Sequence, residues 1–314
     1  MYADETGNAE KNCIGEGGGR TDRQLRTCAG DGERFGFGKF GRFGKFGRLK
    51  VVKANYHTHT TWCDGKDSPR KVIQAAVAKG FEVIGFSSHA MLPESDADWV
   101  LTPEKAPRYL KEIRTLGEEF KDQIRVLCGV EADYVPGGAN PDRSTYAAIF
   151  PDYIIGSVHF VLAPDGARVP VDHTPELLAD GIRDHFDDSA ERFVRAYYAQ
   201  VREMVEKFNF EIVGHLDLVR KFNAKHPYFD EKADWYREEI GKTAAAVAKS
   251  GKIAEVNTGA ISRGWMDDAY PSEEFRGMLR ERGVKFILSS DAHAADAIDC
   301  AFDRFEKAER FVVI

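Results

Sequence analysis

From Leu49 onward, short apolar runs alternate with longer amphipathic segments along the chain. Seven apolar runs are predicted to be strands, and they span residues 50–55, 82–87, 124–130, 153–157, 211–213, 253–256 and 285–288. The segments between them have the periodicity of helices over residues 69–79, 103–120, 188–208, 230–250 and 272–282. Alternating strands and helices are typical of a parallel sheet with helices outside it.

The number of strands favours a barrel. About seven strand–helix units in the 264 residues after position 50 predict a closed or nearly closed α/β barrel. An open, doubly wound sheet is the alternative, but no G-x-G-x-x-G motif follows the first strand to indicate a dinucleotide fold. We therefore expect one barrel domain over residues 49–314.

The first 48 residues have a different pattern. Residues 37–48 repeat the triplet Phe-Gly-Lys or Phe-Gly-Arg four times, and a period of three fits neither a helix face nor an alternating strand. The glycine in every triplet adds backbone entropy, so residues 1–48 are predicted to be a disordered extension without a part in catalysis. Stacking of this Phe/Arg/Gly segment on single-stranded nucleic acid is the functional alternative.

Charge and composition narrow the class of protein. Residues 1–50 carry 10 basic and 7 acidic side chains, whereas the remaining 264 carry 34 and 44, a net charge of −10. Nucleic-acid binders draw on clustered Lys and Arg, so a nucleic-acid partner is not expected. No apolar stretch approaches the roughly 18 residues of a membrane helix, and no secretory signal is recognisable. We therefore expect neither a membrane protein nor a secreted one.

The cysteines indicate the compartment. There are five, at positions 13, 28, 63, 128 and 300, and no C-x-x-C pair occurs among them. An odd, scattered set fits neither a disulfide framework nor a thiolate zinc site. We predict a reducing compartment, the cytoplasm.

Polar residues that can bind metals lie at the C-terminal ends of the predicted strands. The set is His57, His59, Asp64, His89, Glu131, His159, His215, Asp291 and His293. In a parallel barrel these strand ends meet on one face, where active sites are found. The other three histidines, His173, His185 and His226, lie outside this pattern and are expected at the surface.

A metal cluster explains this pattern better than packing does. One histidine at a strand end is more often a hydrogen-bonded residue than a ligand, but buried imidazoles and carboxylates in such numbers cost free energy unless they are paired or ligated. Imidazole and carboxylate ligands without thiolates suit Zn²⁺, Mn²⁺ or Fe²⁺. The set exceeds the needs of one ion, so we expect two or three ions and, from such clusters, hydrolysis of a phosphate ester.

Val51 to Ile314 resembles the polymerase and histidinol phosphatase (PHP) superfamily of metal-dependent phosphoesterases, in particular its histidinol-phosphate phosphatase branch. The resemblance rests on His57-Thr58-His59 with Cys63-Asp64-Gly65, on residues 129–134 (GVEADY), 156–160 (GSVHF), 214–222 (GHLDLVRKF), 255–259 (EVNTG) and 270–272 (YPS), and on Ser290-Asp291-Ala292-His293. It implies a distorted (βα)₇ barrel and hydrolysis of L-histidinol phosphate to L-histidinol and phosphate.

The same resemblance implies roles for individual ligands. One ion would be held by His57, His59, Glu131 and Asp291, and Glu131 would bridge to a second ion held by His159 and His215. The third ion would be held by Asp64, His89 and His293. Many superfamily members have a histidine in place of Asp64, and the aspartate is similar to the histidinol phosphatase branch.

Further residues are candidates for the chemistry on the substrate. Asp64, Asp217 or a water molecule could supply the proton that the leaving alkoxide needs. Arg220 is the first candidate to bind the phosphate because it follows His215 and Asp217 closely and arginine binds phosphate bidentately. Arg263, and Arg183 in the long 160–190 connection, are weaker candidates.

Two other functions remain open from the sequence. The same metal centre could act on another small phosphate ester, a nucleotide, a nucleic-acid end or phosphotyrosine. A binding module that keeps the fold without catalysis is the alternative from another class, and the intact ligand set argues against it.

Overall fold

A computed structural model of the chain describes residues 52–90 and 99–314. The expected disordered extension, residues 1–48, and the domain boundary after it lie outside the described residues. No helix in the described ranges is long and apolar enough to cross a membrane. Cys63, Cys128 and Cys300 are free thiols, and the cytoplasmic location stays a prediction.

Seven parallel strands form the central sheet, in the order β1-β2-β3-β4-β7-β8-β9. They are β1 (Ala54–Asn55), β2 (Val83–His89), β3 (Arg125–Asp133), β4 (Ile154–Ser157), β7 (Ile212–Val213), β8 (Ile253–Asn257) and β9 (Phe286–Ser289). A parallel bridge between Thr58 and Ala292 joins the two ends of the sheet, with the amide of His59 donating to the carbonyl of Ala292 at 2.8 Å. The sheet is thus the nearly closed barrel that the apolar runs predict.

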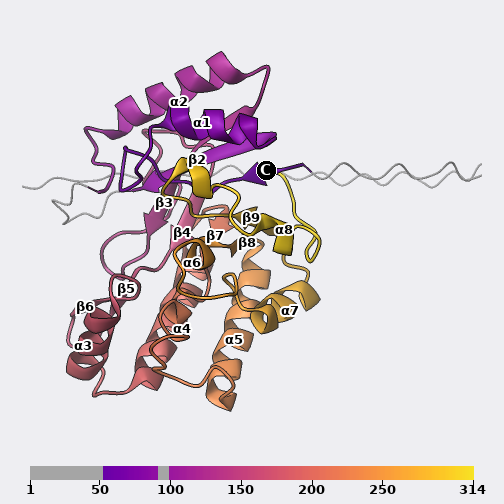
Figure 1. The fold of residues 1–314 in the computed structure, drawn as a ribbon. Coiled ribbons are helices and arrows are strands. Elements are labelled where there is room, and N and C mark those ends of the chain that lie inside the picture. The colour runs from indigo at the N-terminus through magenta and orange to yellow at the C-terminus, as the bar shows by residue number, and fades with distance from the viewer. Residues whose placement is uncertain (1–51, 91–98) are drawn as a thin grey trace, which may run out of the picture. The chain divides into compact units, whose positions relative to one another are not determined.

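Helices surround this barrel (Figure 1). They are α1 (Pro69–Ala78), α2 (Ala106–Phe120), α3 (Pro175–His185), α4 (Ala190–Lys207), α5 (Asp234–Ser250), α6 (Gly259–Ser262), α7 (Glu273–Glu281) and α8 (Phe302–Phe305). Figure 1 shows α1 and α2 beside β2 and β3, and α4, α5 and α7 side by side on the other half of the barrel. Side-chain oxygens of Ser68, Thr174, Ser189 and Ser272 cap the N-termini of α1, α3, α4 and α7, and such caps fix where helices begin.

The predicted 160–190 connection contains structure of its own. Its residues form an antiparallel hairpin, β5 (Phe160–Leu162) and β6 (Arg168–Pro170), followed by α3. Three-residue strands are too short to show an alternating pattern, which is why the sequence did not reveal them. The hairpin pairs with itself and stands outside the order of the barrel strands.

The inside of the barrel changes from apolar to polar along each strand. Alternate residues of a strand share a face, and on β3 these are Leu127, Gly129, Glu131 and Asp133, from the bottom of the barrel to the rim. The ring of Tyr153 fills the space beside Gly129, where a Cβ atom would lie 2.4 Å from its Cζ. Apolar side chains therefore close the lower barrel, and the carboxylates stand near its upper rim.

Candidate metal centre

Most of the predicted ligands come from strand ends or the residues just after them, and Asp64 lies nine residues beyond the end of β1. His89 ends β2 and is aligned in register with Glu131 of β3. His57, His159, His215 and Asp291 each follow the last residue of their strand by two positions. A parallel barrel places these ends at one rim, so residues far apart in sequence converge there.

Four side chains converge around the first group of atoms. Nε2 of His57 lies 3.1 Å from Oε2 of Glu131, and Nε2 of His59 lies 3.2 Å from Oδ1 of Asp291. The cross distances, His59 to Glu131 and His57 to Asp291, are 3.5 and 3.7 Å between the same atoms. These four residues form the group expected to hold one ion.

The second oxygen of Glu131 faces other histidines. Its Oε1 lies 3.0 Å from Nε2 of His215 and 3.4 Å from Nε2 of His159, and it accepts a hydrogen bond from the Ser157 hydroxyl at 2.7 Å. One carboxylate thus presents its two oxygens to two sets of imidazoles. That arrangement suits a bridging ligand.

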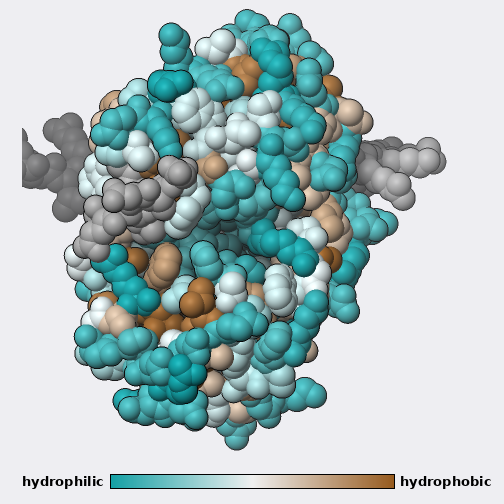
Figure 2. All heavy atoms as spheres, turned by 60° about the vertical axis from the view of Figure 1, so that its left-hand side comes forward, coloured by the Kyte–Doolittle hydropathy of each residue, from teal (hydrophilic) through white to brown (hydrophobic). Residues whose placement is uncertain are grey.

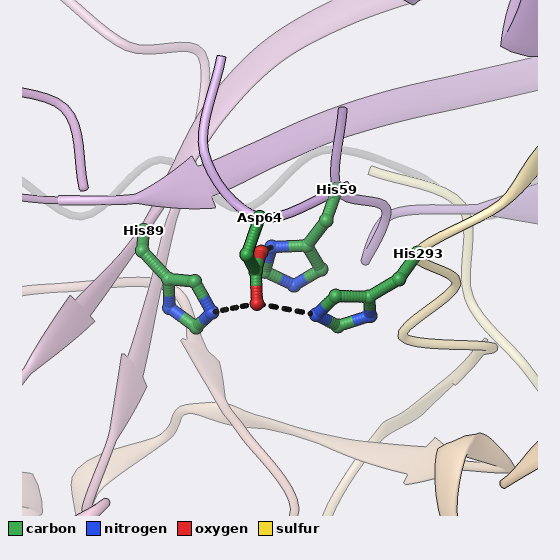
Figure 3. A group of neighbouring side chains, drawn as sticks. All are labelled: His59, Asp64, His89 and His293. Carbon is green, nitrogen blue, oxygen red and sulfur yellow. Dashed lines mark hydrogen bonds and ion pairs between the residues drawn. The ribbon is translucent and has the colours of Figure 1, made fainter. Parts of the chain in front are cut away.

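A third group of side chains lies around Asp64 (Figure 3). Asp64 stands between His89 and His293, with Oδ2 at 3.7 Å from His89 Nε2 and 3.0 Å from His293 Nε2. The other oxygen of Asp64 lies 3.6 Å from Nδ1 of His59. His59, Asp64, His89 and His293 can offer ligand atoms that all lie within 4.8 Å of one another.

The chemistry of these atoms fits divalent transition metals. Nε2 of His57 and of His59, Nδ1 of His89 and Oε2 of Glu131 are buried and have no hydrogen-bond partner among the described residues. Buried polar atoms without partners are costly, whereas imidazole and carboxylate atoms that converge are what such metals bind. The site therefore supports divalent metal binding.

Two carboxylates that the sequence analysis did not select orient the histidines. Both oxygens of Glu255 lie within hydrogen-bond distance of Nδ1 of His57, at 3.0 and 3.2 Å, and Oδ1 of Asp133 lies 2.6 Å from Nδ1 of His159. Such contacts leave Nε2 of each ring to face the centre and raise its basicity. Glu255 and Asp133 both occur at predicted strand ends, so their position was the available signal.

These carboxylates set the charge of the imidazoles. Burial alone would lower the pKa of His57, but Glu255, Glu131 and Asp291 raise it well above its ordinary value. Burial likewise opposes the charge on His159, yet Asp133 and Glu131 raise its pKa to about 10. His59 is the contrast, because burial and the neighbouring histidines lower its pKa to about 3.

A cavity of about 680 Å³ opens over the ligands. It is lined by Asp64, His89, Trp99, Glu131, His159, Phe160, Pro170, Asp172, His173, Leu177, His215, Leu218, Lys221, Arg263, Asp291 and His293. Figure 2 shows a hydrophilic hollow at the centre of one face of the molecule. The cavity is large enough for a small metabolite.

Arg263 is the predicted phosphate-binding residue that reaches this pocket. Its Nη2 donates to Oδ2 of Asp291 at 2.7 Å, and its Nη1 lies 3.3 Å from Nδ1 of His293. Asp291 itself has a left-handed backbone, with φ of 49°, a conformation that aspartate tolerates better than most residues. A guanidinium is thus held directly beside the expected ligands.

The structure corrects the expectations for Arg220 and Arg183. The guanidinium of Arg220 is buried, with Nε 2.6 Å from Glu231 and Nη1 3.2 Å from Asp217, and it does not line the pocket. Arg183 lies on the exposed surface of α3, where it pairs with Asp180 and Asp184. Neither guanidinium is placed to bind a phosphate at the metal centre.

Asp217 is also displaced from its expected place. Its carboxylate is fully buried, accepts from the Ser272 amide at 2.8 Å and pairs with Arg220. It does not line the cavity, so it is not placed to donate a proton to a substrate there. The expectation for Asp217 rested on its closeness to His215 in the sequence, but the two side chains point in different directions.

The pocket also contains residues that the strand-end pattern did not single out. His173 is exposed, as expected, and it also lines the cavity, together with Asp172 and Lys221. Lys221 is the residue directly after Arg220, so the sequence pointed to the right segment and the wrong side chain. Of the other two histidines, His226 is exposed and His185 is partly exposed beside Asp165.

Residues 55–259 match the PHP domain, more than half of the chain, and the chain therefore belongs to the PHP superfamily of metal-dependent phosphoesterases. The relatives that match more than two thirds of this chain are named histidinol-phosphatase or probable histidinol-phosphatase. The chain is 30% identical over 251 residues to a Deinococcus radiodurans protein named probable histidinol-phosphatase, covering 78% of this chain and 88% of that protein. It is 26% identical over 268 residues to the histidinol-phosphatase of Bacillus subtilis, covering 81% and 98%.

Solved structures agree with this assignment. A crystal structure from Listeria monocytogenes shares the fold, with a TM-score of 0.70 and 20% identity over 81% of this chain and 100% of that chain. The histidinol phosphate phosphatase of Lactococcus lactis, solved in complex with Zn, L-histidinol and phosphate, has a TM-score of 0.60 and 25% identity over 84% and 95%. The family and fold expected from the sequence are confirmed.

Proposed function

We propose that the protein hydrolyses L-histidinol phosphate to L-histidinol and inorganic phosphate, using two or three zinc, manganese or iron ions. The observation that carries the proposal is the convergence of the nine expected ligands, seven of which line one pocket. The names of the relatives and the L-histidinol and phosphate in the Lactococcus lactis structure support this substrate.

The residues divide the work between binding and orientation. Metal ions held by the His, Glu and Asp side chains would act as Lewis acids on water and on the phosphoryl oxygens. Glu131 joins the first two ligand groups through its two oxygens, while Glu255 and Asp133 keep His57 and His159 in the orientation that binding requires. Among the described residues that line the pocket, Arg263 and Lys221 are the arginine and lysine side chains, and Arg263, which lies beside the expected ligands, would bind the phosphate.

Asp64 serves as a ligand in this scheme. Burial raises the pKa of its carboxyl, but His293, His59 and His89 lower it far below the ordinary value. A carboxyl that stays ionised at neutral pH cannot donate a proton to the leaving oxygen. With Asp217 outside the pocket, a water molecule would supply this proton.

A comparison of substrates tests the function. We expect kcat/KM for L-histidinol phosphate to exceed that for p-nitrophenyl phosphate and for a dinucleotide by about tenfold or more, which corresponds to about 1.4 kcal/mol of transition-state binding. Metal analysis should find two to three equivalents, and Glu131→Gln should abolish turnover. A better rate on another ester would refute the substrate while leaving the phosphoesterase class intact.

A further inference from the structure

The β5–β6 hairpin carries one wall of the pocket. It leaves the barrel directly after His159, and Phe160 is paired with Pro170 across the two strands. The amide of Val171 then donates to the carbonyl of His159 at 2.9 Å. This bond holds the next residue, Asp172, beside the metal ligands although it is 13 positions away from His159 in the sequence.

Asp172 is held in one orientation by Lys221. The ammonium of Lys221 lies 3.0 Å from Oδ2 of Asp172 and donates to its carbonyl oxygen at 2.7 Å. The other oxygen, Oδ1, accepts no hydrogen bond within the described part of the chain. The side chain is 28% exposed and lines the cavity, so one carboxylate oxygen remains available to a ligand.

The other carboxylates of the pocket are committed elsewhere. Four line it: Asp64, Glu131, Asp172 and Asp291. Three of these are expected metal ligands, and Asp291 is paired with Arg263 as well. Within the described lining, Asp172 is therefore the carboxylate left to receive a cation from the substrate.

The proposed substrate carries such a cation. L-histidinol phosphate has a primary ammonium group on the carbon next to its ester methylene. A phosphate at the metal ligands keeps this ammonium group within a few bond lengths of the centre, which is where the hairpin places Asp172.

We propose, building on the proposed function, that Asp172 binds the ammonium group of the substrate and that Lys221 positions Asp172 for this contact. A charge-assisted hydrogen bond of this kind is stronger than a neutral one. A pocket that presents a carboxylate oxygen to an amine also rejects an ester without the amine, because that oxygen would lose its water and gain no partner. Asp172 thus selects phosphate esters of amino alcohols.

The experiment removes the charge from the enzyme and the amine from the substrate in turn. L-histidinol phosphate is compared with 3-(imidazol-4-yl)propyl phosphate, which lacks only the amine, on the metal-loaded wild type and on Asp172→Asn. We expect the variant to lose about 10- to 100-fold in kcat/KM on L-histidinol phosphate, chiefly through KM, and less than about threefold on the analogue.

Asp165→Asn is the matched control. Asp165 is exposed at the turn of the same hairpin, where it pairs with His185, and it does not line the cavity. This variant should keep wild-type kinetics on both substrates. Metal content and melting temperature are measured for each variant, so that a loss of metal or of fold is seen separately.

Two results would overturn the role of Asp172. An equal loss on both substrates would show that it acts through the structure of the site, and no loss on either would show that it does not touch the substrate. A wild type that hydrolyses neither imidazole ester would refute the proposed function instead. In that case the test uses 2-aminoethyl phosphate and ethyl phosphate as substrates. If the wild type prefers 2-aminoethyl phosphate and Asp172→Asn keeps that preference, the proposed role of Asp172 is refuted.

Discussion

Replacement of Glu255 by glutamine tests how the metal centre is oriented. Glu255 is a fully buried residue of β8. Its Oε1 accepts from the His215 amide at 2.7 Å and from Nδ2 of Asn257 at 2.8 Å, while Oε2 lies 3.0 Å from Nδ1 of His57. Glu255→Gln keeps the shape of the side chain and changes one acceptor into a donor.

The contacts dictate which end of the new amide faces His57. The two donors at Oε1 require the amide oxygen there, so the amide nitrogen that Glu255→Gln introduces must point at Nδ1 of His57. Nδ1 then has to accept a hydrogen bond, and the ring proton moves to Nε2, the atom that faces Glu131 and Asp291. Loss of such an orienting carboxylate lowers metal affinity about 10- to 100-fold, or about 1.4 to 2.7 kcal/mol.

The assay is a zinc titration of metal-free protein in competition with a chromophoric chelator. Glu239→Gln is the matched control, because Glu239 is another buried glutamate, paired with Arg195 and Arg202 and not among the residues lining the pocket. It should lose stability and keep the zinc affinity of the wild type. Equal zinc affinity in Glu255→Gln and the wild type would refute the reasoning.

Four further substitutions test other parts of the structure. Arg220→Ala should lower the free energy of unfolding, measured in urea, by about 3–5 kcal/mol, because it leaves the buried carboxylate of Asp217 without its ion-pair partner. A raised KM at unchanged stability would instead support a role of Arg220 in phosphate binding. Gly129→Ala should cost about 1–3 kcal/mol because its Cβ would overlap the ring of Tyr153. Gly277→Ala, with open space at its Cβ in α7, should instead gain about 0.4–1 kcal/mol, and equal melting temperatures for the two glycine variants would contradict this packing. Hydrogen bonds from a serine hydroxyl and a backbone amide lower the pKa of Asp142, so its stabilisation is present above the unfolded pKa of about 3.9 and lost as pH falls through the folded value. The difference in melting temperature between the wild type and Asp142→Asn should therefore disappear below about pH 4. A difference that persists in acid would show that the ionised carboxylate of Asp142 is not what stabilises the fold there.

The strands and most of the candidate ligands were predictable from the sequence for a physical reason. Parallel strands are buried on both faces and so read as apolar runs, and even the two-residue strand β7 ends a recognisable run. The expected metal ligands follow those runs directly, as in His89 or Glu131. Local order along the chain is enough to place such residues at one rim.

Contacts between distant segments were not predictable in this way. Arg220 follows the end of β7 by only seven residues, yet its side chain turns toward Asp217 and Glu231 because packing, not sequence distance, decides direction. Asp172 was missed for the opposite reason. It is far from a barrel strand in sequence and comes to the pocket only because the hairpin folds back on His159.

The separate pairing of the β5–β6 hairpin has a consequence for how this barrel can be altered. Hydrogen bonding in the barrel passes directly from β4 to β7, so the segment between them does not interrupt the ladder of parallel strands. Substitutions in a cassette of residues 160–189 would therefore leave the parallel ladder intact, as long as His159, α4 and the cassette side chains in the core, such as Val161 and Leu178, are kept. A library confined to this cassette would vary which alcohol the site accepts while the ion-binding residues stay unchanged.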